Sequence, residues 1–258
     1  MSDDDQTAVL SERRDAVLII TLNRPEARNA VNSAVAHGLA LALDELDATP
    51  ELQVGVLTGA GDGFCAGMDL KAFVRGESPY VEGRGFAGIA QQRPRKPLIT
   101  AIEGFAVAGG FEIALACDLI VAARGARLGI PEVKRSLVAA GGALLRLPGR
   151  LPYHLAMELA LTGEPILAER AAELGLVNRL AEPGGAVEEA LALAEQIAAN
   201  GPLALDATKR ILVESADWSE EEFWSRQGEI AGPVFVSEDA REGAQAFAEK
   251  RAPVWKRR

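Results

Sequence analysis

Two glutamates are the residues of this sequence best suited to acid–base chemistry. Glu112 lies in the first turn of an apolar helix predicted over residues 109–117, and Glu132 ends a short strand 20 residues later. A helix and a returning strand can bring both carboxylates to one cleft, where a carboxyl pair can divide acid and base roles. Each also has a simpler interpretation, because a first-turn glutamate stabilises a helix and Glu132 can be a cap or a surface charge.

A glycine-rich stretch, residues 59–71, directly follows a predicted buried strand. Its four glycines within nine positions allow a ligand to approach the backbone closely. Asp69 is expected to cap a short helix, which leaves backbone N–H groups near Met68 free to donate to an anion. The alternative is a glycine-rich surface turn. The stretch is not a phosphate-binding P-loop, because no Gly-Lys-Ser/Thr ends it.

A second stretch, residues 102–118, runs from a predicted strand into Gly109-Gly110 and then into the apolar helix. The first N–H groups of a helix have no partner within the helix, and the helix dipole favours negative charge there. This position can therefore hold an anion or a developing negative charge.

The elements that must position these groups alternate between strands and helices in the first half of the chain. Strands are predicted over residues 17–22, 54–58, 98–102, 119–123 and 127–130. An early helix is predicted after a cap at Asn32 or Ser33. After Gly141 only helices are predicted, over residues 152–161, 168–174, 186–199, 202–214, 220–231 and 238–250. This order predicts an α/β core and a helical C-terminal region that packs on the core or on another subunit.

The composition argues against several classes of function. The 258 residues include 27 basic and 37 acidic side chains, which gives a net charge of −10. Proteins that bind nucleic acids or anionic membranes usually carry a basic face, so neither partner is expected. With two histidines and two cysteines in the chain, a His/Cys zinc site is nearly excluded and no disulfide framework is expected. We therefore expect no metal, and a reducing compartment.

No targeting or membrane-spanning segment is expected. Residues 1–7 are acidic and polar, unlike the basic and then apolar start of a signal peptide. The longest apolar stretch, residues 106–123, is interrupted by Glu112 and Asp118 and would not span a bilayer comfortably. A cytoplasmic protein is expected.

Together and in this order, the motifs strongly resemble the crotonase superfamily, the enoyl-CoA hydratase/isomerase family. The resemblance extends from Leu18 to the C-terminus. Matching segments are residues 22–30 (LNRPEARNA), 64–71 (FCAGMDLK), 104–118, 129–132 (GIPE), 162–163, 171–179 (AAELGLVNR) and 247–251 (FAEKR). The motifs are specific for the superfamily and much less specific for the reaction.

The resemblance implies an α/β fold of the crotonase type. Residues 1–195 would form a spiral of ββα repeats. Residues 196–258 would form a helical trimerisation region that packs on this core and on a neighbouring subunit. A homotrimer, or a homohexamer made of two trimers, is therefore expected.

The resemblance also implies a role for each candidate residue. The backbone N–H groups of Met68 and Gly109 would form an oxyanion hole that polarises a thioester carbonyl and stabilises an enolate-like intermediate. Glu112 would orient or deprotonate a water molecule, and Glu132 would deliver a proton to the α-carbon. The implied reaction is the reversible hydration of a trans-2-enoyl-CoA to a 3-hydroxyacyl-CoA. No cofactor is expected, because coenzyme A is part of the substrate.

An acyl-CoA thioester is the expected partner, and several residues match the family's coenzyme-binding positions. They are Ala27, Arg28, Ala66, Met68, Asp69, Leu70, Lys71, Phe247 and Lys250. Phe247 and Lys250 match positions that reach the coenzyme of a neighbouring subunit. Arg28, Lys71 and Lys250 are candidate phosphate partners, although a charged surface residue is usually only solvated.

Some residues and one segment leave the assignment open. Neither His37 nor His154 matches a catalytic position, and nothing near Cys65 marks it as a nucleophile. Residues 134–142 lack the proline-glycine segment that many hydratases carry after the second glutamate, which leaves the acyl chain length undetermined. The alternatives are enoyl-CoA isomerisation, a carnitinyl-CoA dehydratase-like reaction, or a noncatalytic acyl-CoA-binding scaffold.

Overall fold

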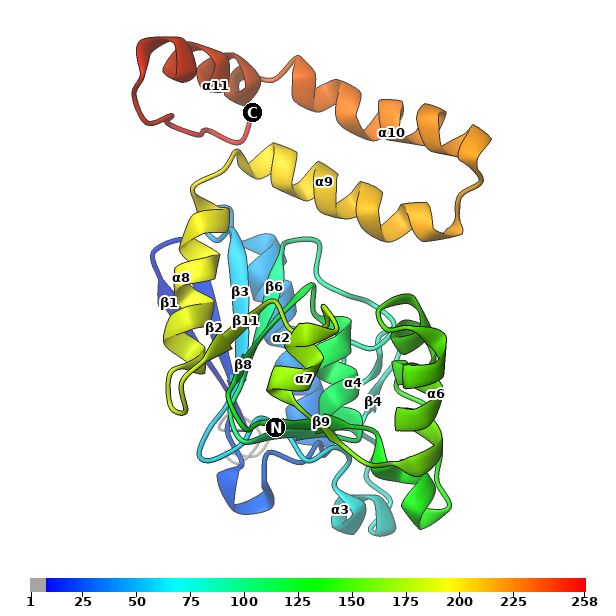
Figure 1. The fold of residues 1–258 in the computed structure, drawn as a ribbon. Coiled ribbons are helices and arrows are strands. Elements are labelled where there is room, and N and C mark those ends of the chain that lie inside the picture. Colours follow the sequence, from blue (N-terminus) through cyan, green and yellow to red (C-terminus); the bar gives the residue numbers. More distant parts are fainter. Residues whose placement is uncertain (1–7) are drawn as a thin grey trace.

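A six-stranded sheet forms the centre of the fold in the computed structural model, which describes residues 8–258 (Figure 1). The strand order is β1-β2-β3-β6-β8-β11, and every neighbouring pair is parallel except β1 and β2. The strands are β1 (Val9–Arg14), β2 (Val17–Leu22), β3 (Val54–Gly59), β6 (Leu98–Ile102), β8 (Leu119–Ala123) and β11 (Arg179–Ala181). The predicted α/β class is confirmed, and strands form at the four segments predicted between residues 17 and 123.

Two smaller sheets complete the strand structure. One contains β10 (Ile166–Leu167), β9 (Arg127–Gly129) and β7 (Phe105–Val107), and the other pairs β4 (Tyr80–Val81) with β5 (Gly85–Phe86). The strand predicted over residues 127–130 thus forms, but in the second sheet. The prediction that only helices follow Gly141 is wrong for β10 and β11. Strands of two or three residues are too short to show an alternating pattern.

Helices surround the sheets, and most lie where they were predicted. The α-helices are α2 (Ser33–Ala48), α3 (Leu70–Val74), α4 (Gly109–Ala116), α5 (Ala143–Arg146), α6 (Tyr153–Thr162), α7 (Ala168–Glu173), α8 (Ala186–Ala198), α9 (Pro202–Glu214), α10 (Glu220–Phe235) and α11 (Glu238–Glu249). Short 3-10 helices are η1 (Pro25–Ala27), η2 (Pro131–Arg135), η3 (Leu147–Gly149) and η4 (Ser215–Asp217). Asn32 caps α2 by accepting a hydrogen bond from Val35 N. None of the helices described over residues 8–258 is long and apolar enough to cross a membrane.

The two faces of the large sheet are covered by different helices. Val56 and Ile99 pack with α8 in one apolar cluster, whereas their neighbours Leu57 and Leu98 belong to the larger cluster with α2 and α4. This division follows from the two-residue alternation of side chains along a strand. The strands are therefore buried on both faces, as parallel strands usually are.

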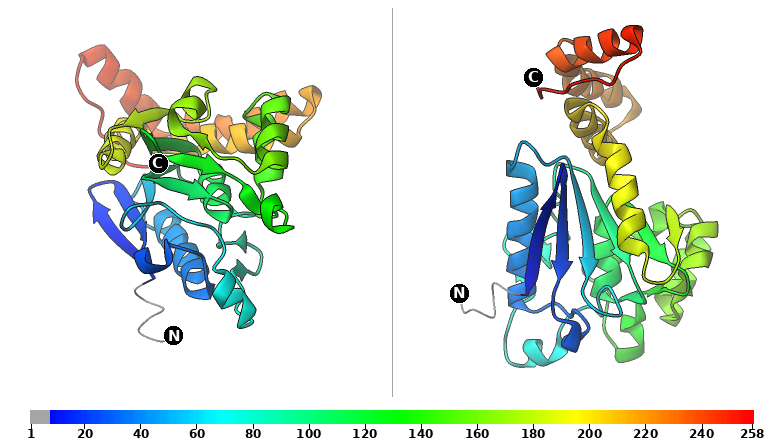
Figure 2. Two further views of the ribbon diagram at one scale, coloured as in Figure 1. Left: turned by 60° about the horizontal axis from the view of Figure 1, so that its bottom comes forward. Right: turned by 90° about the vertical axis from the view of Figure 1, so that its left-hand side faces the viewer.

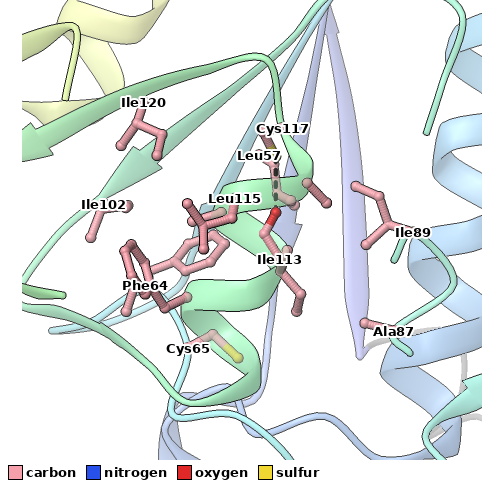
Figure 3. Close-up of a cluster of buried hydrophobic side chains, with 14 of the residues drawn as sticks. Leu57, Phe64, Cys65, Ala87, Ile89, Ile102, Ile113, Leu115, Cys117 and Ile120 are labelled. Carbon is pink, nitrogen blue, oxygen red and sulfur yellow. Dashed lines mark hydrogen bonds between the residues drawn. The ribbon is translucent and has the colours of Figure 1, made fainter. Parts of the chain in front are cut away.

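Helix α4 lies inside the larger cluster, and all eight of its residues are buried. Figure 3 shows Ile113 and Leu115 of this helix among Phe64, Ile102 and Ile120 from neighbouring segments. Apolar packing on every side fixes the axis of α4, and so fixes where its N-terminus points.

The C-terminal helices α9, α10 and α11 project beyond one end of the large sheet (Figure 2). Lys209 on α9 ties them to the core, because its Nζ lies 2.6 Å from Asp118 Oδ2 and 2.8 Å from the carbonyl oxygen of Lys96. Exposed apolar side chains on this region include Leu212, Val213, Trp224, Phe235, Val236, Phe247 and Val254. Packing of residues 196–258 on a neighbouring subunit stays a prediction. Residues 1–7, for which no signal peptide is expected, lie outside the described residues.

Replacing Lys209 with methionine is expected to lower the free energy of unfolding by about 2 kcal/mol, because the largely buried carboxylate of Asp118 then loses its cation. Urea denaturation followed by circular dichroism measures this loss. Arg170→Met is the matched control, since it breaks an exposed ion pair with Glu173 and should change stability by less than about 0.5 kcal/mol. Equal losses in both variants would contradict an anchoring role for Lys209.

Candidate active site

A pocket of about 540 Å³ lies where the loop after β3, the N-terminus of α4 and the 3-10 helix η2 meet. Its lining brings together the four residues that were predicted to act on the substrate. These are Met68, Gly109, Glu112 and Glu132. The proximity of the two glutamates, which spacing alone left as a hypothesis, is thus a feature of the tertiary structure.

Glycines allow the loop after β3 to cross the start of α4 at backbone contact distance. A Cβ at Gly67, whose φ is +97°, would lie 2.9 Å from Gly109 N. A Cβ at Gly110 would lie only 2.1 Å from Cys65 O. Any larger residue at either position would push the loop and the helix apart, and Met68 with them.

The N–H groups of Met68 and Gly109 donate no hydrogen bond to any of residues 8–258. Gly109 is the first residue of α4, so its N–H lies at the positive end of the helix dipole. Ala108 precedes it with φ 52° and ψ −132°, a backbone conformation that costs roughly 1–3 kcal/mol. The N–H groups of Met68 and Gly109 are therefore free among the described residues to donate to an oxyanion as its charge develops.

The carboxylate of Asp69 caps the N-terminus of helix α3. It accepts hydrogen bonds from Lys71 N at 3.1 Å and Ala72 N at 3.0 Å, and it pairs with Arg24 at 3.0 Å. Burial acts to raise the pKa of Asp69, but these partners outweigh burial and hold the pKa below its usual value. Asp69 therefore caps α3, as predicted, and its side chain does not line the pocket.

Glu112 is the charged residue of the buried helix α4 and is 4% exposed. Its Oε1 accepts a hydrogen bond from Ala143 N at 3.0 Å. Burial raises the pKa of Glu112, while backbone hydrogen bonds from residues 141–143 and the charge of Arg146 oppose the rise. The carboxylate is held in one orientation at the pocket wall.

Glu132 has very different surroundings, although it lines the same pocket. Its Oε2 is buried and has no hydrogen-bond partner among the described residues. Burial first, and the charge of Glu112 in addition, raise the pKa of Glu132 to about 7, against the hydrogen bond from its own backbone amide. Glu132 can therefore carry a proton near neutral pH, as a general acid must.

The predicted coenzyme-binding residues divide into those that line the pocket and those that do not. Arg28, Ala66, Met68 and Leu70 line it. Ala27, Asp69 and Lys71 lie near by in the chain but are not part of the lining. Phe247 and Lys250 belong to the end of α11, in the projecting C-terminal region (Figure 1). Their contact with a neighbouring subunit's coenzyme stays a prediction.

Several lining residues were missed by sequence reasoning. Lys134 and Arg135 follow Glu132 in η2 and add two cations, of which Lys134 pairs with Glu164 at 2.5 Å. The apolar side chains missed include Tyr80, Phe86, Val107, Leu137 and Val138. Lys134 and Arg135 could have been predicted to line the pocket because they follow Glu132 closely in the chain. Val107 lies within the matching segment 104–118, and Leu137 and Val138 lie within residues 134–142, which depart from the family pattern. Tyr80 and Phe86 come from segments without a recognisable motif.

The other polar candidates have structural surroundings. Cys65 is buried, donates to Asn29 O at 3.0 Å, and burial raises its pKa to about 12, so it is a poor nucleophile. His37 bonds Ser33 O on its own helix, and His154 packs edge-on against Tyr153. Residues 8–258 contain no group of three or more His, Cys, Asp or Glu side chains that could hold a metal ion.

Comparison with known proteins finds close relatives along nearly the whole chain. Residues 12–258 match the family model described as Enoyl-CoA hydratase/isomerase. Enoyl-CoA hydratase EchA19 of Mycobacterium tuberculosis is 44% identical over 256 residues, which covers 96% of each protein. A carnitinyl-CoA dehydratase of Salmonella typhi is 42% identical over 254 residues, covering 95% of this chain and 97% of that one. The crystal structure of enoyl-CoA hydratase EchA1 from Mycobacterium marinum is 62% identical, with a TM-score of 0.96 over 98% of this chain and 100% of that chain.

At about pH 8, Glu132→Gln is expected to raise the free energy of unfolding by about 2 kcal/mol. Because the folded-state pKa of Glu132 lies above the ordinary 4.5, ionised Glu132 destabilises the folded protein, and this cost grows as the pH rises from 4.5 through about 7. Denaturation at about pH 4.5 and at about pH 8 measures it, with the gain largest at the higher pH. Glu112→Gln should show a smaller gain, because backbone hydrogen bonds from residues 141–143 and the charge of Arg146 oppose the rise in the pKa of Glu112. A pH-independent effect of Glu132→Gln would contradict the argument.

Proposed function

The chain belongs to the enoyl-CoA hydratase/isomerase family, and from this premise we propose that it hydrates a trans-2-enoyl-CoA reversibly to a 3-hydroxyacyl-CoA. One observation carries the proposal beyond family membership. Two glutamates with different surroundings share a pocket with two backbone N–H groups that donate to none of residues 8–258. Hydration needs a base, an acid and an oxyanion site, and the pocket offers a candidate for each.

In the proposed reaction the thioester carbonyl oxygen accepts hydrogen bonds from Met68 N and Gly109 N. When water attacks the β-carbon, electrons move toward this oxygen and an enolate forms. Fixed donors aimed at the developing charge stabilise it without reorganising during the step. Because the donors are backbone groups, the identity of the side chain at position 68 matters less than the path of the loop.

Glu112 and Glu132 then divide the proton transfers. Ionised Glu112 takes a proton from water as the water oxygen bonds to the β-carbon. Protonated Glu132 gives its proton to the α-carbon, and the enolate collapses to the thioester. The step leaves Glu112 protonated and Glu132 ionised, and proton exchange with solvent restores both. The pKa of Glu132, about 7, suits a residue that must donate at neutral pH. The reaction is redox-neutral, and coenzyme A enters as part of the substrate.

The coenzyme's anionic part is proposed to lie near Arg28 and Arg135 at the pocket, with Lys134 also within the lining. These cations offset the net negative charge of the chain at the pocket where the anionic substrate is proposed to bind. Phe247 and Lys250 are proposed to approach the coenzyme of a neighbouring copy in a homotrimer or homohexamer. In that assembly residues 196–258 cover one another's exposed apolar side chains.

A second candidate is a carnitinyl-CoA dehydratase activity, which a 42% identical relative carries in its name. Tyr80 and Phe86 favour it, because aromatic rings can hold a trimethylammonium group. Lys134 and Arg135 disfavour it, since the lining adds these cations but no acidic side chain other than the two glutamates. The balance of charge favours an uncharged, apolar acyl group.

Mixing the enzyme with crotonyl-CoA and with medium- and long-chain trans-2-enoyl-CoAs is expected to remove the absorbance of the conjugated thioester and to add the mass of one water. Glu112→Gln and Glu132→Gln should each lower kcat by about 10²–10⁴. Glu158→Gln, an exposed glutamate on α6, is the control and should leave kcat unchanged.

Other outcomes of this assay identify the alternatives. A product of unchanged mass indicates an isomerase, and turnover of crotonobetainyl-CoA alone indicates the carnitinyl activity. Binding of every acyl-CoA without turnover indicates a scaffold. Each of these results would overturn the hydratase proposal.

Gly67→Ala is expected to lower kcat by about 10²–10³, because the added Cβ displaces the loop from Gly109 N and misplaces one of the two donors. Gly125→Ala is the matched control. Gly125 also has a positive φ, +78°, but a Cβ there meets nothing within 4 Å. Both variants should lose some stability, and only Gly67→Ala should lose kcat. Equal kcat values in the two variants would contradict the proposal that the contact between the loop after β3 and the start of α4 positions the oxyanion donors.

A further inference from the structure

Behind the turn that binds Glu112 lies a buried arginine to which the proposed reaction assigns no role. Arg146 ends helix α5 and is 9% exposed. Its Nη2 donates to Ala90 O at 2.5 Å, and its Nη1 approaches Gly141 O at 3.5 Å. The buried Nε has no hydrogen-bond partner among the described residues. Arg146 forms no ion pair with any described carboxylate, so its charge is available to act at a distance.

The turn of residues 141–143 separates Arg146 from Glu112 by one layer of backbone. On one side, a Cβ at Gly142 would lie 2.0 Å from Arg146 Nη1. On the other side, a Cβ at Gly141 would lie 2.6 Å from Glu112 Oε2, and Ala143 N donates to Glu112 Oε1. The guanidinium and the carboxylate therefore lie on opposite sides of the turn, in a largely buried region. Charges interact most strongly in such a region.

Other charged and titratable groups also act on Arg146 and Glu112. Arg93, Arg150 and the neutral, buried thiol of Cys117 face Arg146, and Glu132 faces Glu112. Arg93 and Arg150 disfavour the charged form of Arg146, whereas Glu112 favours it. Arg146 is thus the cation that acts on Glu112, whereas the groups that act on Glu132 are its own backbone amide and Glu112.

We propose that Arg146 is a positioning residue that keeps Glu112 ionised through the 141–143 turn, and so determines which glutamate is the base and which is the acid. Without this cation the two buried carboxyl groups would compete for one proton on more equal terms. With it, the negative charge resides on Glu112, and that charge in turn favours the protonated form of Glu132. Arg146 touches neither substrate nor reacting atoms, and it acts on the reaction through the charge and orientation of Glu112.

The kinetic test rests on the proposed hydratase function. In the wild type, the low-pH limb of kcat/KM for hydration follows ionisation of Glu112. Arg146→Met is expected to move this limb to higher pH by about one unit while leaving KM nearly unchanged. Arg146→Lys, which keeps the charge, should restore the position of the limb. Arg150→Met is the control from the same arginine cluster and should not move it. A lower kcat at every pH with an unmoved limb would show a purely structural role and overturn the proposal.

A second measurement needs no turnover and uses the folded wild type. Infrared spectra at about pH 6 should show a protonated carboxyl band that Glu132→Gln removes and Glu112→Gln retains. If Glu112→Gln removes the band instead, the proton is on Glu112 and the inference about Arg146 is overturned. This outcome depends neither on the hydratase proposal nor on the folding of Arg146→Met. Absence of turnover with the expected infrared assignment would instead refute the hydratase proposal alone.

Discussion

The backbone crossing at the start of α4 is the constraint on which the pocket depends. Gly67 and Gly110 let the loop after β3 and the helix touch through main-chain atoms, which no pair of side chains would permit. Because all eight residues of α4 are buried, the core rather than the loop sets the direction of its first N–H groups. The packing that stabilises the fold therefore also aims Gly109 N and the carboxylate of Glu112 into one pocket.

The chemical difference between the two glutamates follows from what each one touches. Glu112 is inside a helix, bonded to Ala143 N and opposite a guanidinium. Glu132 is in a 3-10 helix, and one of its carboxylate oxygens is buried and has no hydrogen-bond partner among residues 8–258. Burial disfavours the charged form of both, but Glu112 has backbone donors from residues 141–143 and the charge of Arg146 to compensate, whereas Glu132 has the donor of its own backbone amide but the negative charge of Glu112 against it. Burial raises the pKa of both side chains, and their different partners make the effect on each one different.

Most of the fold was predictable because its long elements have clear periods. The strands predicted between residues 17 and 123 and the helices from α6 to α11 carry enough apolar residues for a pattern to be visible. The short strands β10 and β11 were missed after Gly141, since a strand of two or three residues has no measurable alternation. Strand β1 was missed as well, because its residues are mostly polar and exposed at the sheet edge.

The sequence by itself determined which groups are available for chemistry: the glycines that allow the crossing, and Glu112 and Glu132 as the carboxyl pair. Only the tertiary structure decided how those groups are surrounded. It placed Arg135 in the pocket lining and Lys71 outside it, and it put Arg146 behind the turn that holds Glu112. The physical reason is that burial and hydrogen bonding depend on partners far apart in the chain, and a local pattern of residues contains no information about them.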